Sequence, residues 1–416
     1  MRISNLRLEN RYSDVALVAD VESKKFGKTT IWVSASKEYE SWLCIDRYDG
    51  FLLALLYPAM AYGENIEVDG IVSKRLLRNI MRHVQEILVA YNHRLNKVKI
   101  EVKGTSSEVI KTAKHIGTGF TGGVDSFSTI YENYVLENDA EYKIDTLVFL
   151  NVGSHGHFWQ DEAYQKTMFQ NRYEFLKSYP NVINLPFIQV NSNIHSYYSE
   201  WNFSRFHILA TLSAILTVQQ KIKKYYFASA VGGYDVWIDK AKEYRDTSAN
   251  SYNTDIAVFT EAYLLPLLST ETIELVSDGL QYTRVEKTIG ITDYPLSKQF
   301  LNVCLESEPQ KKNCGQCYKC LRVLMTLQVV DKLDEYAEVF DIEKYSEKRF
   351  YHWCVAVSSA NHNLFQKEIT NFAKENGYRV PSLLVATIVS LIAKLYGVFP
   401  KALQRKLKKI VLSKQR

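Results

Sequence analysis

The stretch HIGTGFTGGVDSFST, residues 115–129, decides the fold that we expect for this chain. Its first half, residues 115–120, is typical of a strand, and the part from Ser126 onward is typical of the first turn of a helix. Between them lies Thr121-Gly122-Gly123-Val124-Asp125-Ser126. Glycines let a backbone approach an anion closely, and the free N–H groups of a helix N-terminus point toward it. The stretch therefore predicts a phosphate-binding loop.

The polar side chains of this loop suit the same ligand. Thr121 and Ser126 can donate hydroxyl hydrogens to phosphate oxygens, and Asp125 can hold the Mg²⁺ that accompanies a polyphosphate. The loop is not a Walker loop, because no Gly-Lys-Ser/Thr follows the glycines, and it lacks the third glycine of the dinucleotide fingerprint. The alternative is a plain Gly-Gly turn between a strand and a helix.

The pattern from residue 112 onward alternates strands with helices, which predicts an α/β fold with a doubly wound, parallel, five-stranded sheet. Ligands in such sheets bind at the carboxyl ends of the strands. The expected strands are 115–120, 145–151, 183–190, 225–230 and 272–276, and the expected helices are 126–137, 159–178, 203–222, 256–268 and 282–290.

Four further side chains near the expected strand ends are candidates for the site. His155 and His157 follow the second strand in a glycine-containing loop, where they could contact a nucleotide or carry protons. Arg205 begins the third helix, and Lys287 lies with Arg284 in the last helix, where a positive charge would stabilise phosphates. The alternatives are exposed histidines in a flexible turn, a charge-paired structural arginine and a solvated helix face.

A cysteine cluster follows the expected sheet. Cys304, Cys314, Cys317 and Cys320 have the spacing C-x₉-C-x₂-C-x₂-C, which suits a tetrahedral Zn²⁺ held by four thiolates in a structural role. An iron–sulfur cluster is the chief rival, because C-x₂-C-x₂-C spacing also holds those clusters. Reduced cysteines packed in a loop are the remaining alternative.

The loop TGGVDS resembles the SGGxDS signature of the PP-loop ATP pyrophosphatases, with Thr121 in place of the first serine. Together with the cysteine cluster, it makes residues 112–330 resemble the 7-cyano-7-deazaguanine synthase family. The resemblance implies that Thr121, Gly122, Gly123, Asp125 and Ser126 hold ATP and Mg²⁺, with Asp125, Ser126, Arg205 and Lys287 in catalysis and His155 and His157 beside the nucleotide. It implies adenylation of a carboxylate, release of pyrophosphate and capture by ammonia; in the family the amide is then dehydrated to a nitrile.

The substrate does not carry over from this resemblance. Asn202-Phe203-Ser204-Arg205 matches the family's PGRN stretch only loosely, and the loop after Asp235 lacks its YPDCR segment. We therefore expect a small-molecule or glycan carboxylate, with ammonia or another amine as the nucleophile. The alternatives are a PP-loop tRNA sulfurtransferase and a non-catalytic, zinc-stabilised interaction module.

The flanking regions suggest three domains: 1–110, an α+β domain that is structural or shapes the substrate site; 111–330, the PP-loop domain with the zinc site; and 331–416, a helical region. In the first domain we expect strands at 14–19, 29–34, 67–72 and 97–102, with helices at 49–62, kinked at Pro58, and 74–91. The chain is 46% hydrophobic, which is ample for a packed core.

Charge and cysteine usage limit the partners. The net charge is +5, but residues 401–416 hold seven Lys or Arg and no acid, so the other 400 residues carry −2, which does not favour nucleic acid. Clustered cysteines without a signal peptide predict a cytoplasmic protein. The apolar run 380–399 and the basic tail predict either peripheral membrane contact or a core-packed helix. The sequence leaves a homodimer open.

Overall fold

The computed structural model describes residues 1–153, 162–198, 200–201, 205–230, 260–304 and 312–398. The chain forms two compact units, Met1–Tyr282 and Thr283–Arg416. Their boundary lies at 282/283, whereas the sequence places divisions near 110 and 330. His155, His157, the Asn202–Ser204 stretch, Asp235 and the tail from residue 399 lie outside the described residues.

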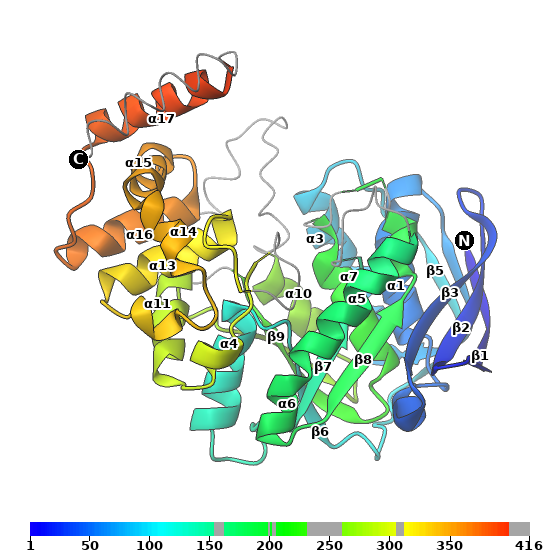
Figure 1. The fold of residues 1–416 in the computed structure, drawn as a ribbon. Coiled ribbons are helices and arrows are strands. Elements are labelled where there is room, and N and C mark those ends of the chain that lie inside the picture. The colour runs from blue at the N-terminus through cyan, green and yellow to red at the C-terminus, as the bar shows by residue number, and fades with distance from the viewer. Residues whose placement is uncertain (154–161, 199, 202–204, 231–259, 305–311, 399–416) are drawn as a thin grey trace. The chain divides into compact units, whose positions relative to one another are not determined.

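The first unit contains one mixed sheet of ten strands in the order β10-β9-β6-β7-β8-β3-β2-β1-β4-β5 (Figure 1). The strands from β10 to β8 are mutually parallel. Their bounds are β6 (His115–Gly119), β7 (Thr146–Leu150), β8 (Phe187–Ser192), β9 (Ile222–Ala228) and β10 (Glu274–Asp278).

The prediction of a five-stranded sheet is wrong in its extent, because the N-terminal residues continue the same sheet. β3 (Gly27–Ser36) pairs antiparallel with β8, with Val33 opposite Ser192 and Ala35 opposite Val190. This pairing covers a strand edge that would otherwise present free backbone N–H and C=O groups. The remaining strands are β1 (Arg2–Asn10), which the sequence analysis missed, β2 (Asp14–Ser23), β4 (Ile66–Ser73) and β5 (Ile100–Ser106).

Helices cover both faces of the parallel strands, as alternation along β7 shows. Val148 points into the apolar cluster that includes α1 (Asp49–Tyr62) and α7 (His207–Thr217). Phe149 points to the opposite face and stacks on Phe169 of α5 (Glu162–Leu176), with ring centroids 5.0 Å apart. The described residues of this unit also form α2 (Lys74–Asn79), α3 (Gln85–Tyr91), α4 (Val124–Ile130), α6 (Ser178–Ile183) and α10 (Glu261–Leu268).

The helix α1 has the bounds that the sequence predicts and continues through Pro58. It is buried almost all round, which fits its uniformly apolar sequence. The predicted helix 74–91 is α2 and α3 joined by a π-helical turn at Ile80–Val84.

The described residues of the second unit are largely helical. The helices are α11 (Arg284–Gly290), α12 (Ser297–Phe300), α13 (Tyr318–Val329), α14 (Ile342–Glu347), α15 (Arg349–Ser359), α16 (Leu364–Glu375) and α17 (Leu383–Val398). Gln328 ties three of them together, since its side-chain oxygen accepts from the hydroxyl of Tyr345 at 2.6 Å and from the indole of Trp353 at 3.0 Å.

Candidate functional site

Three glycines lie at or just after the end of β6, and the structural reason for a glycine differs among the three positions. A Cβ on Gly119 would lie 2.8 Å from the hydroxyl of Tyr225, so Gly119 is required by packing. Gly122 has φ +73°, in the left-handed region that favours glycine. Among the described residues, a Cβ on Gly123 would meet only the Thr121 hydroxyl, at an ordinary 3.5 Å. Neither packing nor backbone strain demands glycine at 123, so a bare backbone there is available to a ligand.

The helix that follows begins without a side-chain cap among the described residues. Gly123 is the N-cap of α4, with extended backbone, and has no side chain that could accept from the first N–H groups. The side chains expected to contact phosphate or Mg²⁺ differ in exposure. Of the two hydroxyl donors, Thr121 is exposed and Ser126 is buried, and the expected Mg²⁺ ligand Asp125 is half-buried in the first turn. The Ser126 hydroxyl donates to the Gly123 carbonyl at 3.0 Å, so it would have to rotate to reach a phosphate.

The position of α4 is set by an acidic side chain that the sequence did not single out. Asp278, the last residue of β10, accepts from the Thr129 hydroxyl at 2.7 Å and from the Asn133 amide at 3.0 Å. These bonds tie the helix after the first parallel strand to the end of the last one. A local pattern at residue 278 carries no sign of this role, because its partners lie 145 or more residues away.

The loops after β7 and β8 are joined at the same edge of the sheet. The Asn151 amide donates to the Asn191 side chain at 2.8 Å, and the Ser192 hydroxyl donates to the Asn151 carbonyl at 2.7 Å. Gly153 has φ +100°, and a Cβ there would lie 2.7 Å from the Cβ of His195. A half-buried His195 therefore lies at the carboxyl edge, where the sequence analysis expected His155 and His157.

The two predicted cations lie in different compact units. Arg205 is half-buried just before α7, and its charge partly opposes the rise that burial causes in the pKa of Tyr57 on α1. Lys287 of α11 is only 2% exposed, so the alternative of a solvated helix face is wrong for this residue.

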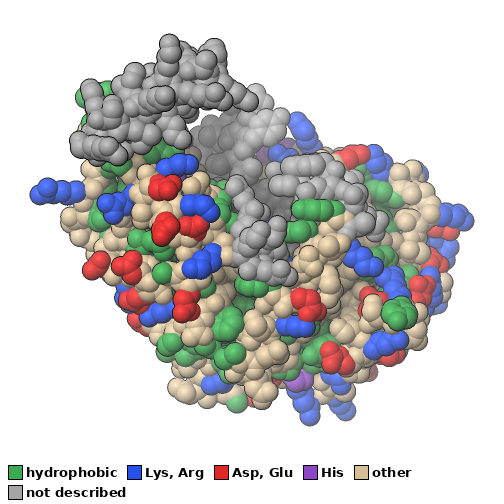
Figure 2. Space-filling model, viewed as in Figure 1, with side chains coloured by type: hydrophobic (Ala, Val, Ile, Leu, Met, Phe, Trp, Pro, Cys, Tyr) green, Lys and Arg blue, Asp and Glu red, His purple; other side chains and the backbone are tan. Residues whose placement is uncertain are grey.

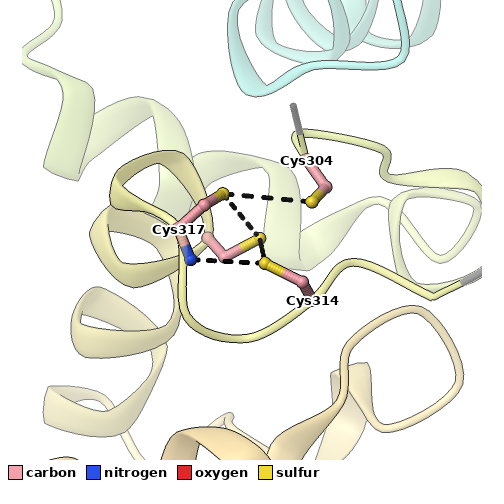
Figure 3. Close-up of side chains that lie close together, drawn as sticks. Cys304, Cys314 and Cys317 are labelled. Carbon is pink, nitrogen blue, oxygen red and sulfur yellow. Dashed lines mark hydrogen bonds between the residues drawn. The ribbon is translucent and has the colours of Figure 1, made fainter. Parts of the chain in front are cut away.

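The four cysteines of the second unit converge on one point. Figure 3 labels three of them, Cys304, Cys314 and Cys317. The Cys304 and Cys317 sulfurs are 3.9 Å apart, those of Cys314 and Cys320 are 3.9 Å apart, and those of Cys317 and Cys320 are 3.4 Å apart. All four sulfurs lie within 4.8 Å of one another. A tetrahedral Zn²⁺ with bonds of about 2.3 Å separates its sulfur ligands by about 3.8 Å. The cluster is therefore close enough to bind a metal ion and is consistent with zinc.

The backbone around the cysteines is built for thiolates. The N–H groups of Gln316 and Cys317 donate to the Cys314 sulfur at 3.5 and 3.3 Å, and Cys317 is the N-cap of α13. Gly315, which lies between Cys314 and Gln316, has φ +69°, and a Cβ there would lie 2.3 Å from the Asp341 carbonyl oxygen. Donors and a helix N-terminus both favour the ionised sulfur.

A buried amide holds Cys304, which is distant in sequence from the other three cysteines, in place. Asn313 is 1% exposed, and its side-chain oxygen accepts from the backbone N–H groups of Val303 and Cys304 at 2.8 and 2.9 Å. Its amide nitrogen donates to the carbonyls of Leu301 and Val339 at 2.9 and 2.8 Å. Asn313 thus positions Cys304 next to the three cysteines at the start of α13.

Without a cation the cluster disfavours ionisation. The neighbouring thiols of Cys304 and Cys317, together with burial, raise the pKa of Cys320, and burial raises the pKa of Cys314. Four thiolates at this spacing need a positive ion among them. Iron–sulfur clusters place two or more irons and sulfides between the ligands, so the close spacing favours a single ion.

The other two cysteines are buried thiols of high pKa. Burial raises the pKa of Cys44 to about 12 and also raises the pKa of Cys354.

Basic and acidic side chains are interspersed on the face shown in Figure 2. In the described part of the chain, no helix combines the length and the apolar character that a membrane crossing requires.

Comparison with known proteins returns no match: no family model, no curated protein and no solved structure corresponds to this chain. The site must therefore be interpreted from its own geometry.

Proposed function

We propose that this chain is an ATP-dependent enzyme that adenylates a carboxylate, releases pyrophosphate and passes the acyl group to ammonia or another amine. The observation that carries this proposal is the loop Thr121–Ser126, which leaves the carboxyl end of β6 with a glycine that the protein itself does not need at 123. Phosphate groups are the ligands that such a loop and an uncapped helix N-terminus suit best.

The order of the parallel strands supports a doubly wound PP-loop fold. From β6 the chain moves to β7 and β8 on one side, then returns to β9 and β10 on the other. The direction changes beside β6, and ligands of doubly wound sheets bind at such a switch point. The loop Thr121–Ser126 is attached to the strand where this change occurs.

In this proposal the backbone N–H groups of residues 121–126 hold the β- and γ-phosphates, and Asp125 holds the accompanying Mg²⁺. A carboxylate oxygen attacks the α-phosphorus, the bond to pyrophosphate breaks, and an acyl adenylate forms. The amine then attacks the acyl carbon, and AMP leaves. The work of the protein is mainly positioning and charge neutralisation, to which Arg205 would add positive charge.

We also propose a structural Zn²⁺ on Cys304, Cys314, Cys317 and Cys320. Four thiolates complete the tetrahedral coordination and leave no open position for a substrate. The remaining thiols speak against a tRNA sulfurtransferase, because Cys44 and Cys354 are buried and of raised pKa, and such an enzyme needs a reactive cysteine near the nucleotide.

Gly123→Ala tests the nucleotide loop. Among the described residues the new Cβ meets no atom closer than 3.5 Å, so folding should be little affected, whereas a bound phosphate would lose its approach to the backbone. We expect ATP affinity and ATP–pyrophosphate exchange, screened over candidate carboxylates, to fall at least about tenfold, by analogy with the loss of one well-placed donor. Gly290→Ala is the matched control, since no atom of the described part of the chain lies within 4 Å of its added Cβ.

Two results would count against the proposal. If Gly123→Ala bound ATP and exchanged pyrophosphate like the parent, the loop would not hold the phosphates. If the zinc-loaded parent bound no ATP at all, the non-catalytic interaction module would be the better interpretation.

A further inference from the structure

The last described helix, α17, exposes a large apolar surface. Its exposed side chains recur at helical spacing, so most of them share one side of the helix. They are 41% to 72% exposed and comprise Leu383, Leu384, Val385, Ile388, Leu391 and Ile392. Helices of globular proteins usually turn polar side chains to water. A surface of this kind marks an interaction site.

The opposite side of α17 is packed on its own unit. Ala386 is fully buried, and the Ser390 hydroxyl lies 2.9 Å from the Ser358 hydroxyl of α15. Figure 1 shows α17 lying beside α15. The helix therefore presents its apolar side outward while its other side stays attached to the protein.

Charge indicates what covers this surface. No acidic residue follows Glu375, whereas the residues after it include nine Lys or Arg. Seven of these nine lie in residues 401–416, directly after α17. The chain thus places an apolar surface and a strongly positive segment next to each other in sequence. A partner that offers both an apolar layer and negative charge is an anionic lipid surface.

We propose that α17 and the basic tail dock the protein peripherally on anionic membranes. The exposed apolar side chains enter the boundary between headgroups and acyl chains, and the cations contact the lipid phosphates. As far as the structure describes it, the helix is too short to span: its 16 residues extend about 24 Å, shorter than the roughly 30 Å hydrocarbon core. A second copy is the poorer partner, because its equally positive tail would be brought close. The proposal is independent of the nucleotide loop.

Vesicle flotation of the full chain tests the proposal, with phosphatidylcholine vesicles compared with vesicles that also contain phosphatidylserine. We expect binding to the anionic vesicles only, and weaker binding at high salt because charge is screened. Ile392→Glu should weaken binding at least about tenfold, since a side chain that is 60% exposed would no longer enter the lipid. Val182→Glu, in α6, is the matched control: it is 59% exposed and should leave binding unchanged.

A tail variant separates the two contributions. Replacing Arg405, Lys406, Lys408 and Lys409 with glutamine leaves α17 intact and should lower affinity for anionic vesicles about a hundredfold or more. Failure of the parent to float with anionic vesicles would overturn the proposal. Equal vesicle binding by the parent and by Ile392→Glu would also overturn it. So would a parent that binds no vesicles and forms, by light scattering, a dimer that Ile392→Glu converts to a monomer.

Discussion

Replacing Asn313 with aspartate tests whether a buried amide positions Cys304 in the cysteine cluster. Aspartate has the same shape, and its remaining oxygen can still accept from the N–H groups of Val303 and Cys304. The amide nitrogen, however, becomes an oxygen that faces the carbonyls of Leu301 and Val339 at 2.9 and 2.8 Å. Two attractive contacts thus become repulsive ones, with no change in side-chain volume.

The expected loss of unfolding free energy follows from the hydrogen bonds that each group loses. Two lost hydrogen bonds cost about 2 kcal/mol, and a buried carbonyl without a donor costs a further 1–3 kcal/mol or so. The Val339 carbonyl keeps one donor, the backbone N–H of Asn313 at 2.8 Å, so the larger loss falls on Leu301. We expect unfolding of the second unit to require about 3–5 kcal/mol less. Because Cys304 is displaced, metal affinity should also fall about 10–100-fold.

The assay combines denaturant unfolding with metal release to a colorimetric chelator. Asn376→Asp is the matched control, because Asn376 is exposed and donates only to the Phe372 carbonyl; its effect should stay within about 0.5 kcal/mol. The reasoning would be refuted if Asn313→Asp held metal as tightly as the parent. A loss of stability alone, with unchanged metal affinity, would show that the amide supports the fold without positioning the ligand.

Two further substitutions test the first unit: one tests a buried carboxyl group, and the other tests the packing of α1 against α7. Burial raises the pKa of Asp49 from 3.8 to about 6, so the folded state holds this proton more tightly than the unfolded state. The free energy of unfolding should therefore fall by about 2 kcal/mol as pH rises from 4 to 7. Asp49→Asn, which keeps a partner for Gln219, should flatten that dependence in urea titrations. Gly50→Ala should cost about 1–3 kcal/mol, because its Cβ would lie 2.5 Å from the Thr217 side chain, forcing α1 and α7 apart; a melting temperature equal to that of Gly290→Ala would contradict this.

Local patterns were enough to predict most of the elements around the candidate sites. The predicted bounds of α1 match the observed ones, because its apolar run ends at Gly63, a C-cap with φ +66°. The parallel strands were found because each is a short apolar run next to a turn signal. β1 was missed, because Arg2–Asn10 is mixed in polarity and mostly half-exposed. The helix α6 was missed, because the expected helix ends at 178 and the expected strand begins at 183; in the structure α6 ends with the C-cap Asn184, which has φ 54°.

The extent of the sheet could not be predicted in the same way. β3 and β8 pair through backbone groups at positions about 160 residues apart, such as Val33 and Ser192. Backbone hydrogen bonds carry no signature of the partner strand, and either strand alone could have been an edge. The same holds for Asp278, whose bonds to Thr129 and Asn133 depend on β10 lying in the same sheet as β6.

The sequence by itself determined the local chemistry of this protein: a glycine loop between a strand and a helix, and four thiols at metal-binding spacing. Both are properties of adjacent residues, since turn geometry and ligand spacing act over a few bonds. The fold decided which distant residues hold them in place: Asp278 bonds to Thr129 of α4, and Asn313 bonds to the backbone of Cys304. Those contacts join residues whose closeness depends on burying the whole core, a collective effect that no short stretch encodes.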